Sequence, residues 1–315
     1  MPSTLAASML DSAGVDAFIA DVAERRGFNE AELRGLFERV ERRAAVLEAV
    51  REPAEALPWA EYRPIFVTPE RIEAGAAFAR EHADLLKRAE AAFGVPSAVI
   101  AAILGVETFY GEQAGNHPVL ETLATLAFAY PPRASFFRSE LESFLLLARE
   151  EGLAPLELEG SYAGAMGMPQ FIASSYRRYA VDFDGDGERD LWNSTADVVG
   201  SVGAYLARHG WQGGEAVAHR ADGGDGDYRE LVERGLEPSV SADELRAAGL
   251  SVEPMPGPRR RVTLVEVQGP DGRQLWVGRS NFYVITRYNH SPLYALAVHQ
   301  VARGIERALA RGGAQ

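Results

Sequence analysis

The chain has 315 residues, of which 47% are apolar and 24% charged, as in ordinary soluble globular proteins. Its formal net charge of −13 argues against a nucleic-acid partner, because binding a phosphate backbone requires a basic surface. The absence of cysteine excludes disulfides, thiol catalysis and thiolate metal sites. No run approaches the roughly 18 apolar residues of a membrane span, and aspartates interrupt residues 1–22, where a signal peptide needs an apolar run. The sequence therefore predicts a globular protein that is cytoplasmic or lacks its targeting segment.

Apolar residues at helical spacing recur over most of the chain. Two helical patterns within residues 15–50 flank a break at 27–29, where Asn29 can cap the second helix. A loop with prolines at positions 53, 58 and 64 follows. Further helices are expected over residues 69–93, 96–110, 135–151, 169–179, 195–209 and 292–311. The fold class is thus mainly α, with an α+β character supplied by the region described next.

Residues 212–289 differ from the rest in their glycine and proline clusters and short β-branched runs. Residues 262–268 and 274–278 flank GPDGR (269–273), which predicts a hairpin with a turn of about four or five residues. Residues 281–287 are expected to form another strand. Ser241 and Glu244 have the spacing of a capping box for one short helix. The region is therefore predicted to be a small antiparallel β insertion.

Glu107 is a carboxylate on the apolar stripe of the 96–110 helix, four residues after Ile103 and three after Leu104. The pattern directs the acid toward the core, and burial without a cationic partner raises a carboxyl pKa. A protonated carboxyl at neutral pH can donate its proton to a leaving group, so Glu107 is a candidate general acid. The alternative is an inward glutamate paired with an arginine or with backbone amides.

An acidic loop at residues 182–190 has the sequence DFDGDGERD. Asp182, Asp184 and Asp186 occupy positions one, three and five of an EF-hand loop, and the Glu188 carbonyl occupies position seven. The match fails at position twelve, which is asparagine, so Asp197 in the next helix is the candidate closing ligand. The loop predicts a structural Ca²⁺ site, since clustered carboxylates repel one another without a divalent cation. The alternative is an acidic surface turn.

Two further segments carry candidate site residues. Residues 160–171 (GSYAGAMGMPQF) contain three glycines that let the backbone approach a ligand closely, or else make a tight connection between helices. The sequence Tyr288-Asn289-His290 is expected to follow a strand and precede a helix, with His290 a surface or capping residue rather than a catalyst. No histidine and aspartate accompany a Gly-x-Ser-x-Gly elbow, so serine hydrolase chemistry has no support.

These motifs together resemble the membrane-bound lytic transglycosylase B family from about residue 18 to residue 311. The resemblance is carried by GVET (105–108), the 160–171 segment, DFDGDG (182–187), Tyr288-Asn289, WAEYR (59–63) and FVTP (66–69). It implies a lysozyme-like helical core with an N-terminal helical domain and a small β domain. It also implies cleavage of the β-1,4 bond between N-acetylmuramic acid (MurNAc) and N-acetylglucosamine (GlcNAc) in peptidoglycan, leaving a 1,6-anhydromuramoyl end.

By the same resemblance Glu107 is the family's acid, and Ser161 contacts the muramoyl N-acetyl group. The remaining positions that match substrate-binding residues of the family are Tyr62, Arg133, Gln170, Phe171, Tyr205, Tyr288, Asn289 and Tyr294. The family often has two successive arginines after Tyr-Pro, whereas this chain keeps only Arg133, which puts one substrate contact in doubt. The resemblance implies four segments: 1–68 helical, 69–211 the catalytic core with the acidic loop, 212–287 the β insertion, and 288–315 returning to the core.

The mechanism follows from the number of carboxylates. Most glycosidases use two, but enzymes assisted by the substrate's N-acetyl group need only one. Glu107 would protonate the glycosidic oxygen, the acetamido oxygen would trap the cation, and Glu107 would then deprotonate the O6 hydroxyl for internal attack. The alternatives are a hydrolytic muramidase of the same fold and a non-catalytic peptidoglycan-binding protein.

The expected setting is the bacterial cell envelope, in the periplasm. The expected partners are glycan strands of peptidoglycan and no nucleic acid, and no organic cofactor is expected. Family members are commonly lipoproteins, so membrane attachment through a segment outside this sequence stays open, as does association with cell-wall synthesis or lysis machinery.

Overall fold

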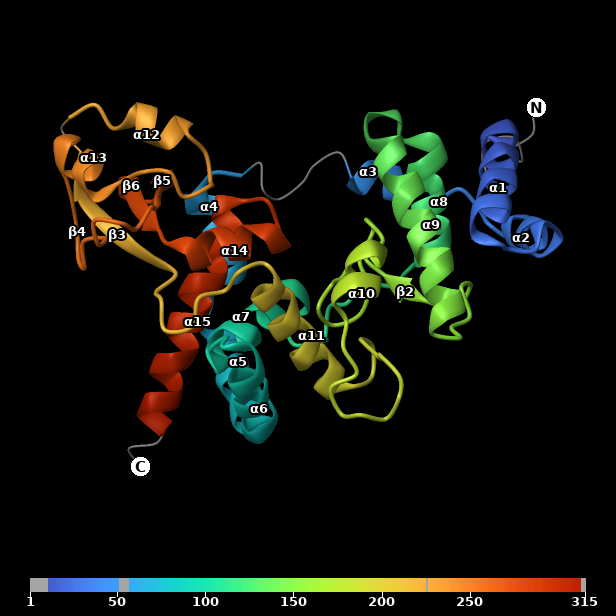
Figure 1. Ribbon diagram of the computed structural model, residues 1–315, viewed down its shortest axis with the longest axis horizontal. Coiled ribbons are helices and arrows are strands. Elements are labelled where there is room, and N and C mark those ends of the chain that lie inside the picture. The colour runs from blue at the N-terminus through green and yellow to red at the C-terminus, as the bar shows by residue number, and fades with distance from the viewer. Residues whose placement is uncertain (1–10, 51–56, 225, 313–315) are drawn as a thin grey trace. The chain divides into compact units, whose positions relative to one another are not determined.

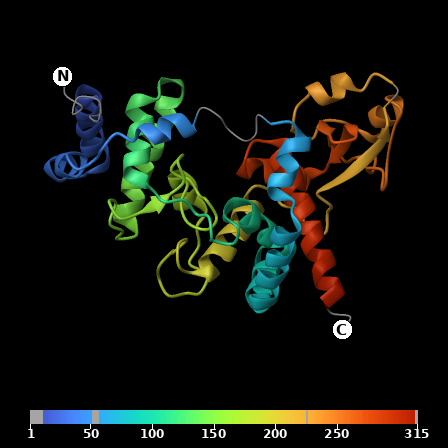
Figure 2. The same cartoon turned by 180° about the vertical axis from the view of Figure 1, so that it is seen from behind.

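The computed structural model describes residues 11–50, 57–224 and 226–312 (Figures 1 and 2). Its contacts divide the chain into two compact units. The first contains Met1–Pro53 and Gln113–Thr195, and the second contains Ala54–Glu112 and Ala196–Gln315. Each unit therefore combines two separate stretches of sequence. The division at residues 68, 211 and 287 that the resemblance implies stays a prediction.

The first unit is helical. Its elements are α1 (Ser12–Arg26), α2 (Glu30–Phe37), α3 (Ala44–Ala49), α8 (Val119–Ala129), the 3-10 turn η2 (Pro131–Arg133), α9 (Ala134–Glu150) and α10 (Ala173–Tyr179), with a two-residue strand pair, β1 (His117–Pro118) and β2 (Glu159–Gly160). Asn29 caps α2 as predicted, since its side chain accepts the backbone N–H groups of Ala31 and Glu32. Helix α8, beside α9 in both views, was not predicted. Every residue of 119–127 is buried, so the helix has no polar face to give a 3.6-residue period.

Most of the second unit is helical. Apart from two short helices beside its sheet, its helices are α4 (Trp59–Phe66), α5 (Pro69–Glu81), α6 (Ala83–Phe93), α7 (Ser97–Thr108), α11 (Thr195–Arg208), α14 (Ser280–Tyr288) and α15 (Pro292–Gly312). Helix α15 packs against α4, α5 and α7. The expected loop after residue 56 is wrong, because Pro58 caps a helix and Pro64 is accommodated inside it. The expected single helix over 69–93 is divided in two at His82.

A four-stranded antiparallel sheet completes the second unit. Its strands are β3 (Ala218–Gly223), β4 (Leu250–Val252), β5 (Thr263–Gly269) and β6 (Gly272–Gly278), in the order β4-β3-β6-β5. The apolar core beside it includes Leu245, Leu264 and Val277 and adjoins α12 (Arg229–Glu233) and α13 (Ala242–Ala247). The capping box of α13 is confirmed. The hairpin is confirmed with a tighter turn, because Gly269 pairs with Gly272 and leaves two residues between them.

Residues 281–287 form part of helix α14 instead of the expected strand. The β-branched run 284–286 indicated a strand, but its side chains are buried within a helix. Asn281 is fully buried, and its side chain bonds the backbone of Gln212 and Glu215. These bonds satisfy the amide of a fully buried side chain.

No single helix in the described part of the chain is long and apolar enough to cross a membrane. Helices α6 and α7 reach that length and composition only as a pair, with a bend of 110° between them.

His299 makes the second unit sensitive to acid. Its ring lies 6.1 Å from that of Trp276, and burial, followed by the charge of Arg303, lowers its pKa from 6.5 to about 4. The unfolded chain therefore binds more protons between these pH values, so stability is complete above pH 6.5 and falls as the pH approaches 4. Because the ring is partly exposed, we expect a loss of at most about 3 kcal/mol. Urea unfolding at pH 7 and at pH 4.5 measures the free energy of unfolding. Between these pH values it should fall less for His299→Gln than for wild type. Equal falls would contradict the role given to His299.

Candidate active site

Glu107 lies in the last turn of α7, a helix buried on every side. Residues 98–106 and Thr108 are buried, whereas Glu107 is partly exposed. The single apolar stripe expected from the sequence is therefore only part of a uniformly apolar helix. The carboxylate sits at the point where this buried helix reaches accessible space, which lets a rigid element present it to a ligand.

The chain after Glu107 is held in an uncommon conformation. Phe109 and Tyr110 have φ of 51° and 60°, a left-handed region that costs free energy in residues other than glycine. Two backbone bonds close the helix, from Phe109 N–H to the Gly105 carbonyl and from Tyr110 N–H to the Leu104 carbonyl, both 3.1 Å. The geometry fixes the end of the helix, and with it the backbone of the acid.

Arg71 supports this helix end, and the sequence reading missed it. It is 7% exposed and donates to the carbonyls of Gly105 (2.8 Å), Ile65 (2.6 Å) and Phe66 (3.0 Å). The only local signal was a charged residue in the first turn of a helix, where solvent exposure is the usual outcome. Gly105 allows the close packing here, because a Cβ added to it would lie 2.4 Å from the Tyr110 hydroxyl.

Tyr294 is a hydrogen-bond partner of Glu107. Its hydroxyl donates a hydrogen bond of 2.5 Å to Glu107 Oε1. Tyr294 lies on helix α15, 187 residues after Glu107. Tyr294 is 3% exposed, and burial, followed by the nearby charge of Glu107, raises its pKa well above 10. The phenol therefore stays protonated near neutral pH and acts as a donor to the carboxylate.

Two more predicted tyrosines lie next to this pair. The ring of Tyr288 is stacked 6.4 Å from that of Tyr294, and Tyr205 meets Tyr288 edge-on at 4.8 Å. Burial, followed by the charge of Glu107, raises the pKa of Tyr288 well above 10. The Tyr205 hydroxyl donates to the Arg287 carbonyl at 2.5 Å. The three rings form an aromatic group beside the acid.

Tyr62 and Asn289 complete the predicted residues of the second unit. Tyr62 is 1% exposed, and its ring packs on Trp59 and Phe66. Asn289 ends α14, and its carbonyl accepts the Ser291 N–H at 2.7 Å. Asn289 thus follows a helix rather than the expected strand. The exposed His290 does not cap α15, since Ser291 Oγ accepts the N–H groups of Leu293 and Tyr294.

Ser161 and Gln170 belong to a loop of the first unit. Ser161 Oγ accepts the N–H groups of Ala163 (3.3 Å) and Ala165 (3.0 Å). Gln170, in a left-handed conformation with φ of 53°, donates through Nε2 to the carbonyls of Ala114 and Gly167. Phe171 is 2% exposed and anchors the loop in the core.

The glycines of this loop allow backbone segments to approach one another. A Cβ on Gly160 would lie 2.2 Å from the Ala165 carbonyl oxygen, and one on Gly167 2.2 Å from the Leu191 carbonyl oxygen. Elsewhere in the unit, Arg133 is exposed and its guanidinium lies 4.3 Å from the centre of the Phe136 ring.

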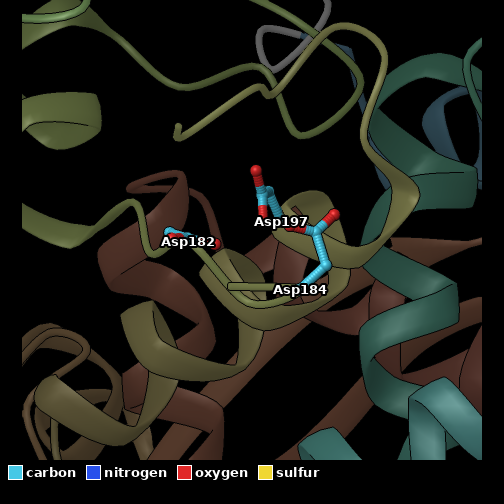
Figure 3. Close-up of side chains that lie close together, drawn as sticks. All are labelled: Asp182, Asp184 and Asp197. Carbon is cyan, nitrogen blue, oxygen red and sulfur yellow. The ribbon is translucent and has the colours of Figure 1, made fainter. Parts of the chain in front are cut away.

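The acidic loop holds its aspartates by backbone hydrogen bonds. Asp182 accepts the N–H groups of Gly185 and Gly187, and Asp186 accepts that of Glu188. Carboxylate oxygens of Asp182, Asp184 and Asp197 lie within 4.8 Å of one another (Figure 3). Asp186, which the sequence also predicted as a ligand, is not in this group.

The chemistry of these residues fits a hard divalent cation. Asp197 is fully buried while Asp182 and Asp184 are exposed, so three negative charges converge at the base of the loop. Their mutual repulsion is relieved by an ion that takes oxygen ligands. Asn193, at position twelve of the loop, donates its side-chain amide to Asp190 and so has a structural role there.

The chain is similar to known proteins over nearly its whole length. The Transglycosylase SLT domain family matches residues 11–303. Membrane-bound lytic murein transglycosylase B of Escherichia coli (strain K12) is 40% identical over 304 residues, which are 93% of this chain and 82% of that protein. The crystal structure of soluble lytic transglycosylase SltB1 from Pseudomonas aeruginosa is 48% identical and has a TM-score of 0.88, covering 95% of this chain and 99% of that one.

Some of the matching structures contain ligands. Lytic transglycosylase Slt35 of Escherichia coli, in complex with calcium, is 38% identical with a TM-score of 0.86, covering 98% and 99% of the two chains. SltB3 of Pseudomonas aeruginosa, in complex with NAG-anhNAM-pentapeptide, is 31% identical with a TM-score of 0.80, covering 92% and 78%. The predicted mainly helical, lysozyme-like fold is confirmed by these similarities. The chain belongs to the Transglycosylase SLT domain family of lytic transglycosylases.

Proposed function

We propose that this protein is a peptidoglycan lytic transglycosylase that cleaves the MurNAc-β-1,4-GlcNAc bond without water and leaves 1,6-anhydroMurNAc ends. Family membership over residues 11–303 supports the activity. The observation that carries the chemistry is the carboxylate of Glu107, presented at the end of a buried helix with the Tyr294 hydroxyl on one oxygen.

Glu107 serves as acid and then as base. It protonates the glycosidic oxygen as the bond to the anomeric carbon breaks, and the acetamido oxygen of MurNAc attacks that carbon from the other face. The resulting carboxylate takes the proton of the O6 hydroxyl, which then displaces the acetamido oxygen. The Tyr294 hydroxyl stabilises the ionised carboxyl between these steps, because hydrogen bonding to the charged form favours it.

Ser161 holds the acetamido group in this proposal. A hydroxyl has two acceptor lone pairs and one proton to donate. The N–H groups of Ala163 and Ala165 use the acceptor side, which leaves the proton of Ser161 for the acetamido carbonyl. The predicted residues that bind the rest of the glycan are Tyr62, Arg133, Gln170, Phe171, Tyr205, Tyr288 and Asn289, with Tyr294 beside the acid.

The substrate places the protein in the bacterial cell envelope. SltB3, a relative, binds a NAG-anhNAM-pentapeptide, and this chain acts on glycan strands of the same class. We further propose that the protein works in the periplasm and associates with cell-wall enzymes. It would be attached to the membrane through a segment outside this sequence.

Digestion of purified sacculi in ¹⁸O-labelled water tests the reaction. We expect muropeptides with unlabelled 1,6-anhydro ends by mass spectrometry, because the acceptor is the O6 hydroxyl of the same sugar. A muramidase digest in the same water is the positive control for labelling. Label at the new MurNAc ends would assign the protein to the hydrolytic alternative.

We also propose that the acidic loop binds one structural Ca²⁺ through Asp182, Asp184, Asp186, the Glu188 carbonyl and Asp197. The convergence of three carboxylates and the calcium complex of Slt35 support this site. The ion would tie the loop to the start of α11 and take no part in the reaction.

Calcium at 100 times its dissociation constant should stabilise the fold by about 2.7 kcal/mol. Thermal unfolding in calcium and in chelator measures the shift. Asp197→Asn should abolish it, whereas Asp222→Asn, which alters an exposed aspartate outside the loop, should keep it. Identical melting temperatures with and without calcium would show that the loop is only an acidic turn.

A further inference from the structure

A pocket of about 770 Å³ lies within the second unit, on a face of α15. Residues of α4, α5, β3, β6 and α15 line it, and none of them belongs to the site described above. Four arginines are among them: Arg63, Arg220, Arg303 and Arg307. No carboxylate lines the pocket. On a chain with a net charge of −13, this is a local concentration of positive charge.

The arginines are only partly neutralised. Arg303 pairs with Glu306 at 2.5 Å. Arg63 donates to the amide oxygen of Gln300, and Arg307 to the Arg303 carbonyl, so neither of these bonds supplies a negative charge. Arg220 projects from β3 and is exposed. A guanidinium presents a planar set of donors that matches carboxylates and phosphates, so the pocket has the chemistry of a site for an anion with more than one charged group.

The rest of the lining combines apolar and aromatic side chains with the amides of Gln274 and Gln300. Val67 and Ile72 contribute aliphatic surface, and the rings of Trp276 and His299 meet edge-on at 6.1 Å. The Nε1 of Trp276 is buried and has no hydrogen-bond partner among the described residues. Aliphatic surface beside guanidinium groups suits an acidic peptide with small apolar side chains better than a bare phosphate.

We propose that this pocket binds the stem peptide of peptidoglycan, which carries several carboxylates and small apolar side chains. The proposal rests on the proposed function, because that function brings this polymer to the enzyme. The pocket would hold the polymer through its peptides while the glycan is cleaved elsewhere. Its removal should therefore weaken the capture of peptide-bearing substrate without slowing the chemical step.

The direct test is calorimetric titration of the full chain with a free synthetic stem pentapeptide, which has no sugar and no bond to cleave. The double variant Arg220→Gln/Arg307→Gln should bind it at least tenfold more weakly, a difference of about 1.4 kcal/mol. The control is Arg229→Gln/Arg259→Gln, which makes the same change of net charge at exposed arginines outside the pocket. It should bind like wild type, and melting temperatures should show that both variants are folded.

The proposal is wrong if the wild-type protein does not bind the pentapeptide, or if the pocket and control variants bind it equally well. It is also wrong if inorganic pyrophosphate displaces the peptide at the peptide's own concentration. Such displacement would identify a phosphate site. With sacculi as substrate, the pocket variant should raise KM and keep kcat, and with peptide-free glycan strands both constants should match wild type. Because the titration needs no turnover, failure of the proposed reaction would be distinguishable from failure of this site.

Discussion

Glu107→Gln is expected to fold normally and to lose a factor of about 10² to 10⁴ in turnover, the usual contribution of general acid–base catalysis. The amide keeps the shape of the side chain and an oxygen that can accept the Tyr294 hydroxyl, but it has no proton to give and cannot act as base. Turnover is measured as release of anhydromuropeptides from sacculi at saturating substrate.

Glu112→Gln is the matched control, because it makes the same chemical change on an exposed residue five positions later. It should keep wild-type turnover. Tyr294→Phe should fall between the two, since it removes one hydrogen bond from the carboxylate and leaves the acid in place. A Glu107→Gln enzyme with more than about a hundredth of wild-type turnover would remove Glu107 from its assigned role.

Gly167→Ala is expected to destabilise the first unit by several kcal/mol or to prevent its folding. Two costs add here. The residue has φ of +66°, where alanine costs about 1 to 2 kcal/mol. The new Cβ would also lie 2.2 Å from the Leu191 carbonyl oxygen, a backbone atom that cannot move aside by rotating a side chain. Chemical denaturation and the soluble yield of the variant measure the effect.

Gly152→Ala separates these two costs. Gly152 lies in the same unit with φ of +65°, but a Cβ there would have nothing within 4 Å. Gly152→Ala should lower the free energy of unfolding only by the conformational cost, about 1 to 2 kcal/mol. Equal destabilisation by the two variants would mean that the close approach to Leu191 contributes nothing.

Local signals in the sequence predicted local structure. Three elements were predicted from short stretches and are confirmed: the cap of α2 by Asn29, the capping box of Ser241 and Glu244 in α13, and the β5–β6 hairpin. These features depend on residues a few positions apart, whose geometry a short stretch of chain determines. The acidic loop is also held by local bonds, since the backbone N–H groups that Asp182 and Asp186 accept lie two to five residues away.

Elements determined by distant packing were not predictable in this way. Helix α8 lacks a polar face because neighbours surround it, and the β-branched run in α14 becomes helical around the buried Asn281. Nothing in the residues around Glu107 indicated its hydrogen bond to Tyr294. Resemblance to a family named both residues, but not the bond between them.

The hydrogen bond from Tyr294 to Glu107 also determines at which stage of synthesis and folding the site can form. Glu107 lies on α7, whereas Tyr294 lies 187 residues later on α15, which packs against α7. A nascent or C-terminally truncated chain carries Glu107 without α15 to cover it. The hydrogen bond to the acid therefore forms only after α15 has been synthesised and has packed against α7.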